Sequence, residues 1–290
     1  MSVVLVTGGS SGIGRATAHL LAARGDDVVL ASRGKGALET AAAECRQRGP
    51  GSVSSHAVDV RDAGAVDALV DAVVGEFGRL DVVVHAAAVV AYGQFPDVPV
   101  DVFDGVLDTN VRGPANVARS VLPLFRRQGR GHLVLLGSVI GDMAAPGMTP
   151  YVVTKYAVRS LGRQLALENR DLPHVHITVV SPGPVDTPIY RQAANYEGRA
   201  GRPPFPVVAP EYVARAILGV LDRPRDRVQV GPANGVMRLG FSLFPRLFDA
   251  FVGPLIRVLA TRPGHLGPTP GNVLEPREEL EAVRGGENQG

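Results

Sequence analysis

Residues 3–14 read Val-Val-Leu-Val-Thr-Gly-Gly-Ser-Ser-Gly-Ile-Gly, and this stretch decides the fold class. The apolar run 3–6 predicts a buried β-strand, and the glycines and serines after it predict a tight turn. Apolar residues then recur at helical spacing until Gly25, a residue type that commonly ends a helix. The stretch therefore predicts a strand, a glycine-rich turn and a helix in succession.

The same alternation of strand and helix repeats along the chain. Such a repeat requires parallel crossover connections. We therefore predict an α/β fold, a doubly wound parallel seven-stranded sheet of Rossmann type with helices on both faces. Apolar runs predict the remaining strands at 28–31, 53–58, 80–84, 133–136, 175–180 and 228–230, with helices at about 36–48, 63–77, 150–169 and 210–221.

The composition is that of a folded, enzyme-sized protein. The 290 residues are 45% hydrophobic and 20% charged, which excludes a disordered chain. Thirty basic residues face 28 acidic ones, and this near-balance gives no sign of a nucleic-acid partner. The single cysteine, Cys45, excludes an internal disulfide and a cysteine-based zinc site.

Three regions divide the chain. Residues 1–232 contain all the predicted strands and form the Rossmann-type domain, and residues 233–260 form an apolar helical extension. Residues 261–290 are rich in glycine and proline, which predicts a mobile tail. The chain reaches its first turn at Gly8, which leaves no room for a signal peptide, so we expect a cytoplasmic protein.

The glycine-rich turn is suited to bind the phosphates of a dinucleotide. Glycines have no Cβ atom, so the backbone can approach a pyrophosphate closely, and the following helix offers free N–H groups. The residues of the turn that we expect to contact the cofactor are Gly8, Ser10, Ser11, Gly12, Ile13 and Gly14.

The end of the second strand favours NADP as the cofactor. An acidic residue there binds the ribose 2′-hydroxyl of NAD, whereas a basic residue accommodates the 2′-phosphate of NADP. The sequence at this position is Ala31-Ser32-Arg33, and the first carboxylate is Glu39. Arg33 is suited to a bidentate phosphate contact, and Ser32 adds a hydroxyl.

Tyr151 and Lys155 are candidate catalytic residues. They lie four apart at the start of a predicted helix, so both side chains are expected on one face. An ammonium beside a phenol lowers the tyrosine pKa from about 10, and such a tyrosine can give a proton to a carbonyl oxygen or take one from an alcohol. Ser138 follows the strand 133–136, at the edge where open α/β sheets bind ligands.

In their order along the chain, these motifs resemble the short-chain dehydrogenase/reductase family over about residues 3–231. The resemblance rests on Thr7-Gly8-x-x-x-Gly12-x-Gly14, Asn110, Ser138 and Tyr151-x-x-x-Lys155. It implies that Tyr151 is the general acid/base and that Lys155 lowers its pKa and binds the nicotinamide ribose. It also implies that Ser138 holds the substrate oxygen and that Asn110 positions a water in the proton relay.

Further matches to the family extend the expected cofactor site. The resemblance implies that Asp59 and Val60 contact the adenine, and that Val185 and Thr187 contact the nicotinamide carboxamide. We also expect a homo-oligomer, a dimer or a tetramer.

One motif departs from the family pattern. Where the family usually has Asn-Asn-Ala-Gly, this chain has His85-Ala86-Ala87-Ala88. We expect Ala86 and Ala87 to keep the backbone contacts to the cofactor, and we interpret His85 as a core histidine with its hydrogen bonds satisfied. His174 and His176 have no third ligand nearby, so we expect no metal site.

Two apolar segments follow the sixth predicted strand. The loop 184–210 is rich in proline and aromatic residues and is long enough to act as a lid over a hydrophobic substrate, and a poorly ordered surface loop is the alternative. Residues 236–259 carry an apolar stripe interrupted by charges and by prolines that disfavour a membrane-spanning helix. The stripe could pack on the core or a second subunit, which we favour, form a wall of the substrate entrance, or lie on a membrane surface.

The sequence thus predicts an NADP-dependent oxidoreductase that interconverts a carbonyl and an alcohol on a largely hydrophobic small molecule. An NAD-linked alcohol dehydrogenase is one alternative. A non-catalytic, cofactor-binding regulator on the same fold is the other, because a fold alone does not establish a function.

Overall fold

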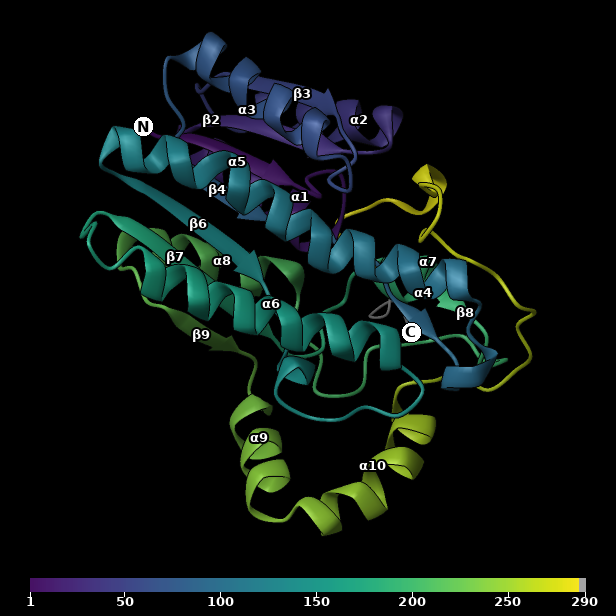
Figure 1. Cartoon of the computed structure of the whole chain (residues 1–290). Coiled ribbons are helices and arrows are strands. Elements are labelled where there is room, and N and C mark those ends of the chain that lie inside the picture. The colour runs from purple at the N-terminus through teal and green to yellow at the C-terminus, as the bar shows by residue number, and fades with distance from the viewer. Residues whose placement is uncertain (287–290) are drawn as a thin grey trace.

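The computed structural model describes residues 1–286, apart from the side chain of Arg257. Its main sheet has seven parallel strands in the order β3-β2-β1-β4-β6-β7-β9, so the predicted fold is confirmed (Figure 1). The strands are β1 (Val3–Thr7), β2 (Asp27–Ser32), β3 (Val53–Ala57), β4 (Val82–His85), β6 (Gly131–Leu136), β7 (Val175–Pro182) and β9 (Arg227–Val230).

Helices cover both faces of the sheet because side chains alternate along each buried strand. Val4 and Val6 of β1 pack beneath one layer of helices, whereas Val3 and Leu5 pack beneath the other. The first layer consists of α1 (Gly12–Arg24), α2 (Lys35–Arg46) and α8 (Pro210–Asp222), and the second of α3 (Ala63–Phe77), α5 (Gly113–Gln128) and α6 (Thr149–Glu168).

The strand order reverses between β1 and β4, which are neighbours in the sheet. In open α/β sheets, the crevice at such a reversal, outside the carboxyl ends of the strands, is where ligands bind. The glycine-rich turn after β1, the alanines after β4 and the serine after β6 all meet at this edge.

Two short strands beside this edge were not predicted from the sequence. β5 (Ala91–Tyr92) pairs with β8 (Ala194–Asn195) in a second, two-stranded sheet, and β8 belongs to the segment expected to be a lid loop. Strands of two residues are too short to show any periodicity. The remaining elements here are α4 (Val100–Leu107), the π-helical turn η2 (Asp108–Arg112), the single turn η3 (Val139–Gly141) and α7 (Ile189–Gln192).

Two helices, α9 (Asn234–Leu243) and α10 (Pro245–Leu259), form an arm that projects from the body next to β9 (Figure 1). Ion pairing and hydrogen bonding hold the arm at both ends. Arg238 of α9 pairs with the buried carboxylate of Asp142 at 3.1 Å. Arg202 donates to the carbonyl oxygens of Val258 and Leu259 at the carboxyl end of α10.

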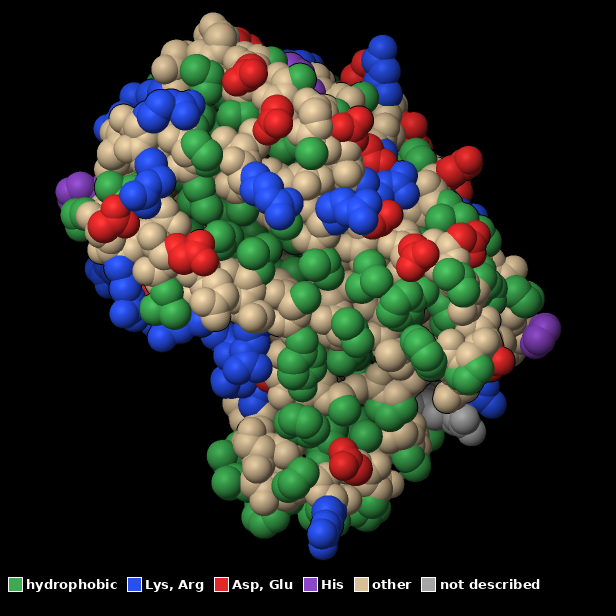
Figure 2. Space-filling model, viewed as in Figure 1, with side chains coloured by type: hydrophobic (Ala, Val, Ile, Leu, Met, Phe, Trp, Pro, Cys, Tyr) green, Lys and Arg blue, Asp and Glu red, His purple; other side chains and the backbone are tan. Residues whose placement is uncertain are grey.

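The outer side of the arm is apolar and exposed, as the hydrophobic side chains at the foot of Figure 2 show. Leu243 is 60% exposed and Val258 is 67% exposed, so residues 236–259 do not pack on the core as a whole. No helix within residues 1–286 combines the length and the hydropathy needed to cross a membrane.

Residues 261–286 run back along the body in place of the expected mobile tail. Val273 is fully buried and packs against Val102 and Val106 of α4. Gly271, at φ 56°, lets the segment pass within contact of the Ala193–Ala194 backbone, where a Cβ atom would lie 2.4 Å from main-chain atoms. The glycines that suggested mobility therefore permit close packing. Residues 287–290 of the expected tail lie outside the described part of the chain.

A buried histidine lies in the centre of the sheet. His132 of β6 is 5% exposed, and its Nε2 atom lies 2.8 Å from the hydroxyl oxygen of Thr178 on β7. Burial, aided by the neighbouring His176, lowers the pKa of His132 from 6.5 to about 4. The folded protein therefore holds this ring neutral at pH values where an unfolded chain would protonate it.

We predict that His132 makes the fold less stable in mild acid. Below about pH 6.5 the unfolded state binds a proton that the folded state does not, so stability falls as the pH drops towards 4. Between about pH 7.5 and about pH 5, the natural protein should lose roughly 2 kcal/mol more free energy of unfolding than a His132→Gln variant. Urea unfolding at both pH values measures this, and equal losses in the two proteins would refute it.

Candidate active site

A cavity of about 690 Å³ lies at the carboxyl edge of the sheet. Its walls include the glycine-rich turn, the segment after β4, the loop 136–140 after β6, the start of α6 and the inner side of the arm. All of the residues assigned to the cofactor site from the sequence line this cavity. Of the four assigned to catalysis, Ser138, Tyr151 and Lys155 line it, whereas Asn110 does not.

The glycine-rich turn packs directly against the segment after β4. Gly8 has φ 70°, and a Cβ atom there would lie 2.6 Å from the backbone nitrogen of Ala87. A Cβ atom on Gly14 would lie 2.2 Å from the carbonyl oxygen of Gly8. Side chains at these two positions would separate the turn from β4, so the turn requires glycine for steric reasons.

We predict opposite effects of alanine at two helical glycines. Gly14→Ala forces a Cβ atom into the Gly8 carbonyl and should lower the free energy of unfolding by about 1–3 kcal/mol. Gly75→Ala in α3 is the matched control, because nothing lies within 4 Å of its Cβ position. That variant should gain up to about 1 kcal/mol from helix propensity. Denaturant unfolding compares the two, and equal stability of both variants would contradict the steric account.

His85 occupies the position where the family pattern has asparagine. Its Nδ1 atom lies 2.8 Å from the hydroxyl oxygen of Thr7, and its side chain is buried. The Nε2 atom has no hydrogen-bond partner among the described residues, so the expected core histidine is only half satisfied. Burial and the nearby charge of Lys155 lower the pKa of His85 to about 3, which keeps the ring neutral. The alanines after it preserve the backbone path, since the Ala86 N–H donates to the Thr7 carbonyl at 2.9 Å.

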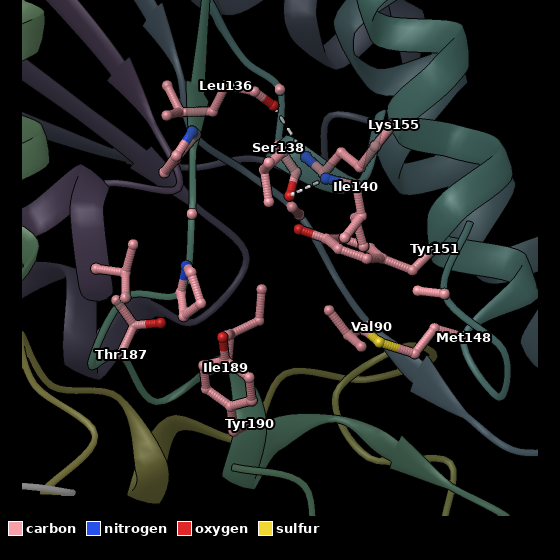
Figure 3. Close-up of a pocket in the computed structure, with 18 of the residues that line it drawn as sticks. Val90, Leu136, Ser138, Ile140, Met148, Tyr151, Lys155, Thr187, Ile189 and Tyr190 are labelled. Carbon is pink, nitrogen blue, oxygen red and sulfur yellow. Dashed lines mark hydrogen bonds between the residues drawn. The ribbon is translucent and has the colours of Figure 1, made fainter. Parts of the chain in front are cut away.

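Three polar side chains converge on the cavity from η3 and α6. The hydroxyl groups of Ser138 and Tyr151 point towards one another, and Lys155 lies above the tyrosine in this view (Figure 3). Lys155 is 3% exposed, and its Nζ atom donates to the carbonyl oxygen of Leu136 at 2.9 Å. The same nitrogen lies 5.2 Å from the centre of the Tyr151 ring. The helical spacing of four residues thus brings the ammonium and the phenol together, as expected.

Burial, rather than the neighbouring charge, sets the proton affinities of this pair. It lowers the pKa of Lys155 to about 8 and raises the pKa of Tyr151 above its ordinary value of 10. That Lys155 lowers the pKa of Tyr151 in the working site stays a prediction. Burial removes the phenolate from water, and this cost raises the pKa of Tyr151.

Asn110 lies in the π-helical turn, and its side chain is fully engaged. Its Oδ1 atom accepts from the Val89 N–H at 2.9 Å, while Nδ2 donates to the Val89 carbonyl at 2.8 Å and to the Thr154 hydroxyl at 3.1 Å. Asn110 therefore joins η2 to the segment after β4 and to helix α6, which carries Tyr151 and Lys155. Its role in a proton relay stays a prediction.

The residues expected at the adenine and carboxamide ends lie on opposite sides of the cavity. Asp59 forms an ion pair with Arg61 at 2.6 Å, and the Val60 carbonyl accepts from the Asn116 side chain at 3.0 Å. Val185 and Thr187 follow β7, and Thr187 lies beside Gly12, where a Cβ atom would be 3.2 Å from its methyl group. Their contacts with a cofactor stay predictions.

The substrate side of the cavity is apolar. Val90 and Tyr92 form a buried cluster against which Met148, Ile189 and Tyr190 pack (Figure 3). The arm adds a second apolar wall, which consists of Met237, Phe244, Leu247, Phe248, Phe251, Val252, Leu255, Ile256 and Leu259. One of the three interpretations of the stripe, a wall of the substrate entrance, thus agrees with the geometry.

Residues 2–197 match the family model of the short chain dehydrogenases. The chain belongs to the short chain dehydrogenase family. An uncharacterized oxidoreductase of Bacillus subtilis is 32% identical over 251 residues, which cover 85% of this chain and 70% of that protein.

Solved structures of other dehydrogenases have the same fold. The alcohol dehydrogenase of the archaeon Thermococcus sibiricus, complexed with 5-hydroxy-NADP, is 28% identical with a TM-score of 0.69. A short chain dehydrogenase of Mycobacterium paratuberculosis bound to NAD is 25% identical with a TM-score of 0.70. Each alignment covers 79% of this chain and 96% of the other. This short chain dehydrogenase is therefore an oxidoreductase of a family that binds nicotinamide cofactors.

The residues of this dehydrogenase fit such a cofactor. The Gly12 N–H and the Ser11 hydroxyl both donate to an oxygen acceptor, the carbonyl of Ala282, at 2.8 and 3.0 Å. These donors thus already bind an oxygen where a phosphate oxygen is expected. Within residues 1–286, no three His, Cys, Asp or Glu side chains come together in a way that could hold a metal ion.

The sequence did not reveal that the chain's own carboxyl-terminal segment reaches this site. Glu281 and Asn272 line the cavity, and Arg33 donates to the carbonyl oxygens of Asn272 and Val273 at 2.6 and 3.2 Å. These contacts join residues more than 200 positions apart, mostly through backbone atoms. No local pattern of side chains could have indicated them.

Proposed function

We propose that this dehydrogenase uses NADP(H) to interconvert a carbonyl and an alcohol on a largely hydrophobic small molecule. The observation that supports this function is the convergence of Ser138, Tyr151 and Lys155 on one wall of an otherwise apolar cavity. A nicotinamide, when bound, supplies or accepts the hydride.

Ser138, Tyr151 and Lys155 then orient the substrate and transfer the proton. Ser138 donates a hydrogen bond to the substrate oxygen and orients it towards Tyr151. Tyr151 gives its phenolic proton to that oxygen during reduction, or takes the proton from the alcohol during oxidation. Lys155 has a pKa of about 8, so it is mostly an ammonium at neutral pH and stabilises the phenolate that forms. Lys155 is buried in the cavity wall, whereas Ser138 and Tyr151 are partly exposed to the cavity, where a substrate can reach them.

The turn at the end of β2 supports NADP as the cofactor. Arg33 follows the strand where an NAD-specific site has an acid, and both Arg33 and Ser32 line the cavity. The relative from Thermococcus sibiricus, whose structure holds 5-hydroxy-NADP, is consistent with this choice, whereas the relative from Mycobacterium paratuberculosis holds NAD. An NAD-linked alcohol dehydrogenase is therefore the second candidate.

The apolar walls support a hydrophobic substrate. Ile189 and Tyr190 of the predicted lid lie opposite the catalytic tyrosine, and the arm extends the apolar surface outward from that point. Assays of NADPH oxidation against ketones of graded size should therefore show rates that rise with the apolar bulk of the ketone. A preference for small polar ketones would argue against this substrate class.

We predict that Tyr151→Phe abolishes turnover and leaves NADPH binding intact. The variant keeps the ring but loses the hydroxyl that we propose transfers the proton, so kcat should fall by at least about 100-fold. Tyr156→Phe is the matched control, because Tyr156 lies on the same helix and is 37% exposed. It should keep full activity. Turnover retained by Tyr151→Phe across a ketone panel would refute the mechanism, and intact binding without turnover in the natural protein would favour the regulator.

We predict that the natural protein binds NADPH more tightly than NADH, and that Arg33→Ala removes this preference. A charge-assisted contact with the 2′-phosphate should be worth about 10- to 100-fold in the ratio of the two dissociation constants. The ratio isolates that contact, because any disturbance of the neighbouring segment affects both cofactors alike. Arg215→Ala, an exposed arginine on α8, is the control. A preference of the natural protein for NADH would support the second candidate.

A further inference from the structure

The carboxyl-terminal segment 272–282 crosses the phosphate-binding end of the cavity. The Ala282 carbonyl accepts hydrogen bonds from the Gly12 N–H at 2.8 Å and the Ser11 hydroxyl at 3.0 Å. Both donors belong to the turn that opens α1, where the proposed cofactor would place its pyrophosphate. A hydrogen-bond donor that already holds this carbonyl is not available to a phosphate oxygen in the same position.

The same segment places a carboxylate at the start of α2. Glu278 Oε2 accepts from the N–H groups of Gly36 and Ala37 at 2.7 and 3.1 Å. These backbone donors follow Arg33 by three and four residues, close to the expected 2′-phosphate. The positive end of a helix favours an anion there, and the Glu278 side chain supplies one.

Contacts of Arg33 and the second carboxylate, Glu281, extend the overlap between the segment and the expected phosphate positions. Arg33 donates to the carbonyl oxygens of Asn272 and Val273, so its guanidinium is engaged before any cofactor binds. Glu281 lines the cavity, where burial raises the pKa of its carboxyl group. The Ser10 hydroxyl and the positive charges of Arg33 and Arg15 oppose that rise. The segment thus offers oxygen atoms to the turn after β1, to the start of α2 and to Arg33, which are the three phosphate-binding elements.

We propose that residues 272–282 are an internal competitor of the cofactor, in which carbonyl and carboxylate oxygens take the positions of the dinucleotide phosphates. The inference rests on the proposed function, because it requires that NADP(H) binds at this turn. Cofactor binding then displaces the segment, and the apparent dissociation constant exceeds that of the open form by the ratio of closed to open molecules. Release of the segment makes the chain competent for catalysis.

Cofactor affinity in full-length variants tests the competition. The double variant Glu278→Gln/Glu281→Gln keeps the shape of the segment but removes both charges, so it should bind NADPH at least about fivefold more tightly than the natural protein. Glu279→Gln is the matched control, because Glu279 lies between the two, pairs with Arg277 at 3.2 Å, and is 64% exposed at its side chain. It should leave the affinity unchanged. Fluorescence titration with NADPH measures all three dissociation constants without turnover.

Limited proteolysis of the natural protein tests displacement directly. Trypsin can cleave after Arg277 and Arg284, which flank the contacts of Glu278, Glu281 and Ala282. If NADPH displaces the segment, saturating NADPH should accelerate cleavage at both sites severalfold, as mass spectrometry of the released peptides would show. If the segment instead closes over the bound cofactor, NADPH should slow the same cleavage, and that result would overturn the proposal.

The outcomes separate this inference from the function on which it rests. Equal NADPH affinity of the natural protein and the double variant would overturn the competition while the proposed function stands. Absence of NADPH and NADH binding in every variant would refute the proposed function and the inference together. Tighter binding by the double variant, with faster cleavage in the presence of NADPH, would support both.

Discussion

The contact between the glycine-rich turn and the segment after β4 is the constraint on which the site depends. Because neither Gly8 nor Gly14 has a Cβ atom, the turn packs against Ala87 and α1 begins directly at the sheet edge. The Gly12 N–H and the Ser11 hydroxyl consequently face the cavity. The proposed cofactor and the chain's own carboxyl-terminal segment both require these donors, so one steric constraint underlies binding and the proposed competition.

Burial shapes the proton affinities of the candidate catalytic groups. Lys155 is held in the interior by one hydrogen bond to the Leu136 carbonyl, and desolvation lowers its pKa to about 8. The same desolvation raises the pKa of Tyr151, which keeps the phenol protonated and ready to donate. Reduction of a carbonyl needs a protonated tyrosine, so in this state the pair is prepared for proton donation. The neutral ring of His85 adds no competing charge nearby.

Several parts of the fold and the site were predictable because their signals are local. The strands 3–6 and 133–136 are continuous apolar runs, and Tyr151 and Lys155 share a helix face because of their spacing. The half-satisfied state of His85 and the engagement of Asn110 with Val89 were not predictable. Each depends on which atoms of a distant strand or loop lie opposite the side chain, and spacing along one element does not encode that.

The sequence by itself determined the seven-stranded sheet, its helical layers and the residues gathered at its carboxyl edge, because periodicity and glycine placement act over a few neighbouring residues. Only the tertiary structure decided what the arm and the carboxyl-terminal segment do. The arm forms one wall of the cavity because Asp142 and Arg202 hold its ends. The segment reaches the phosphate-binding turn through backbone contacts such as that of Gly12 with Ala282. Every residue type offers the same backbone carbonyl, so its partner is chosen by the fold alone.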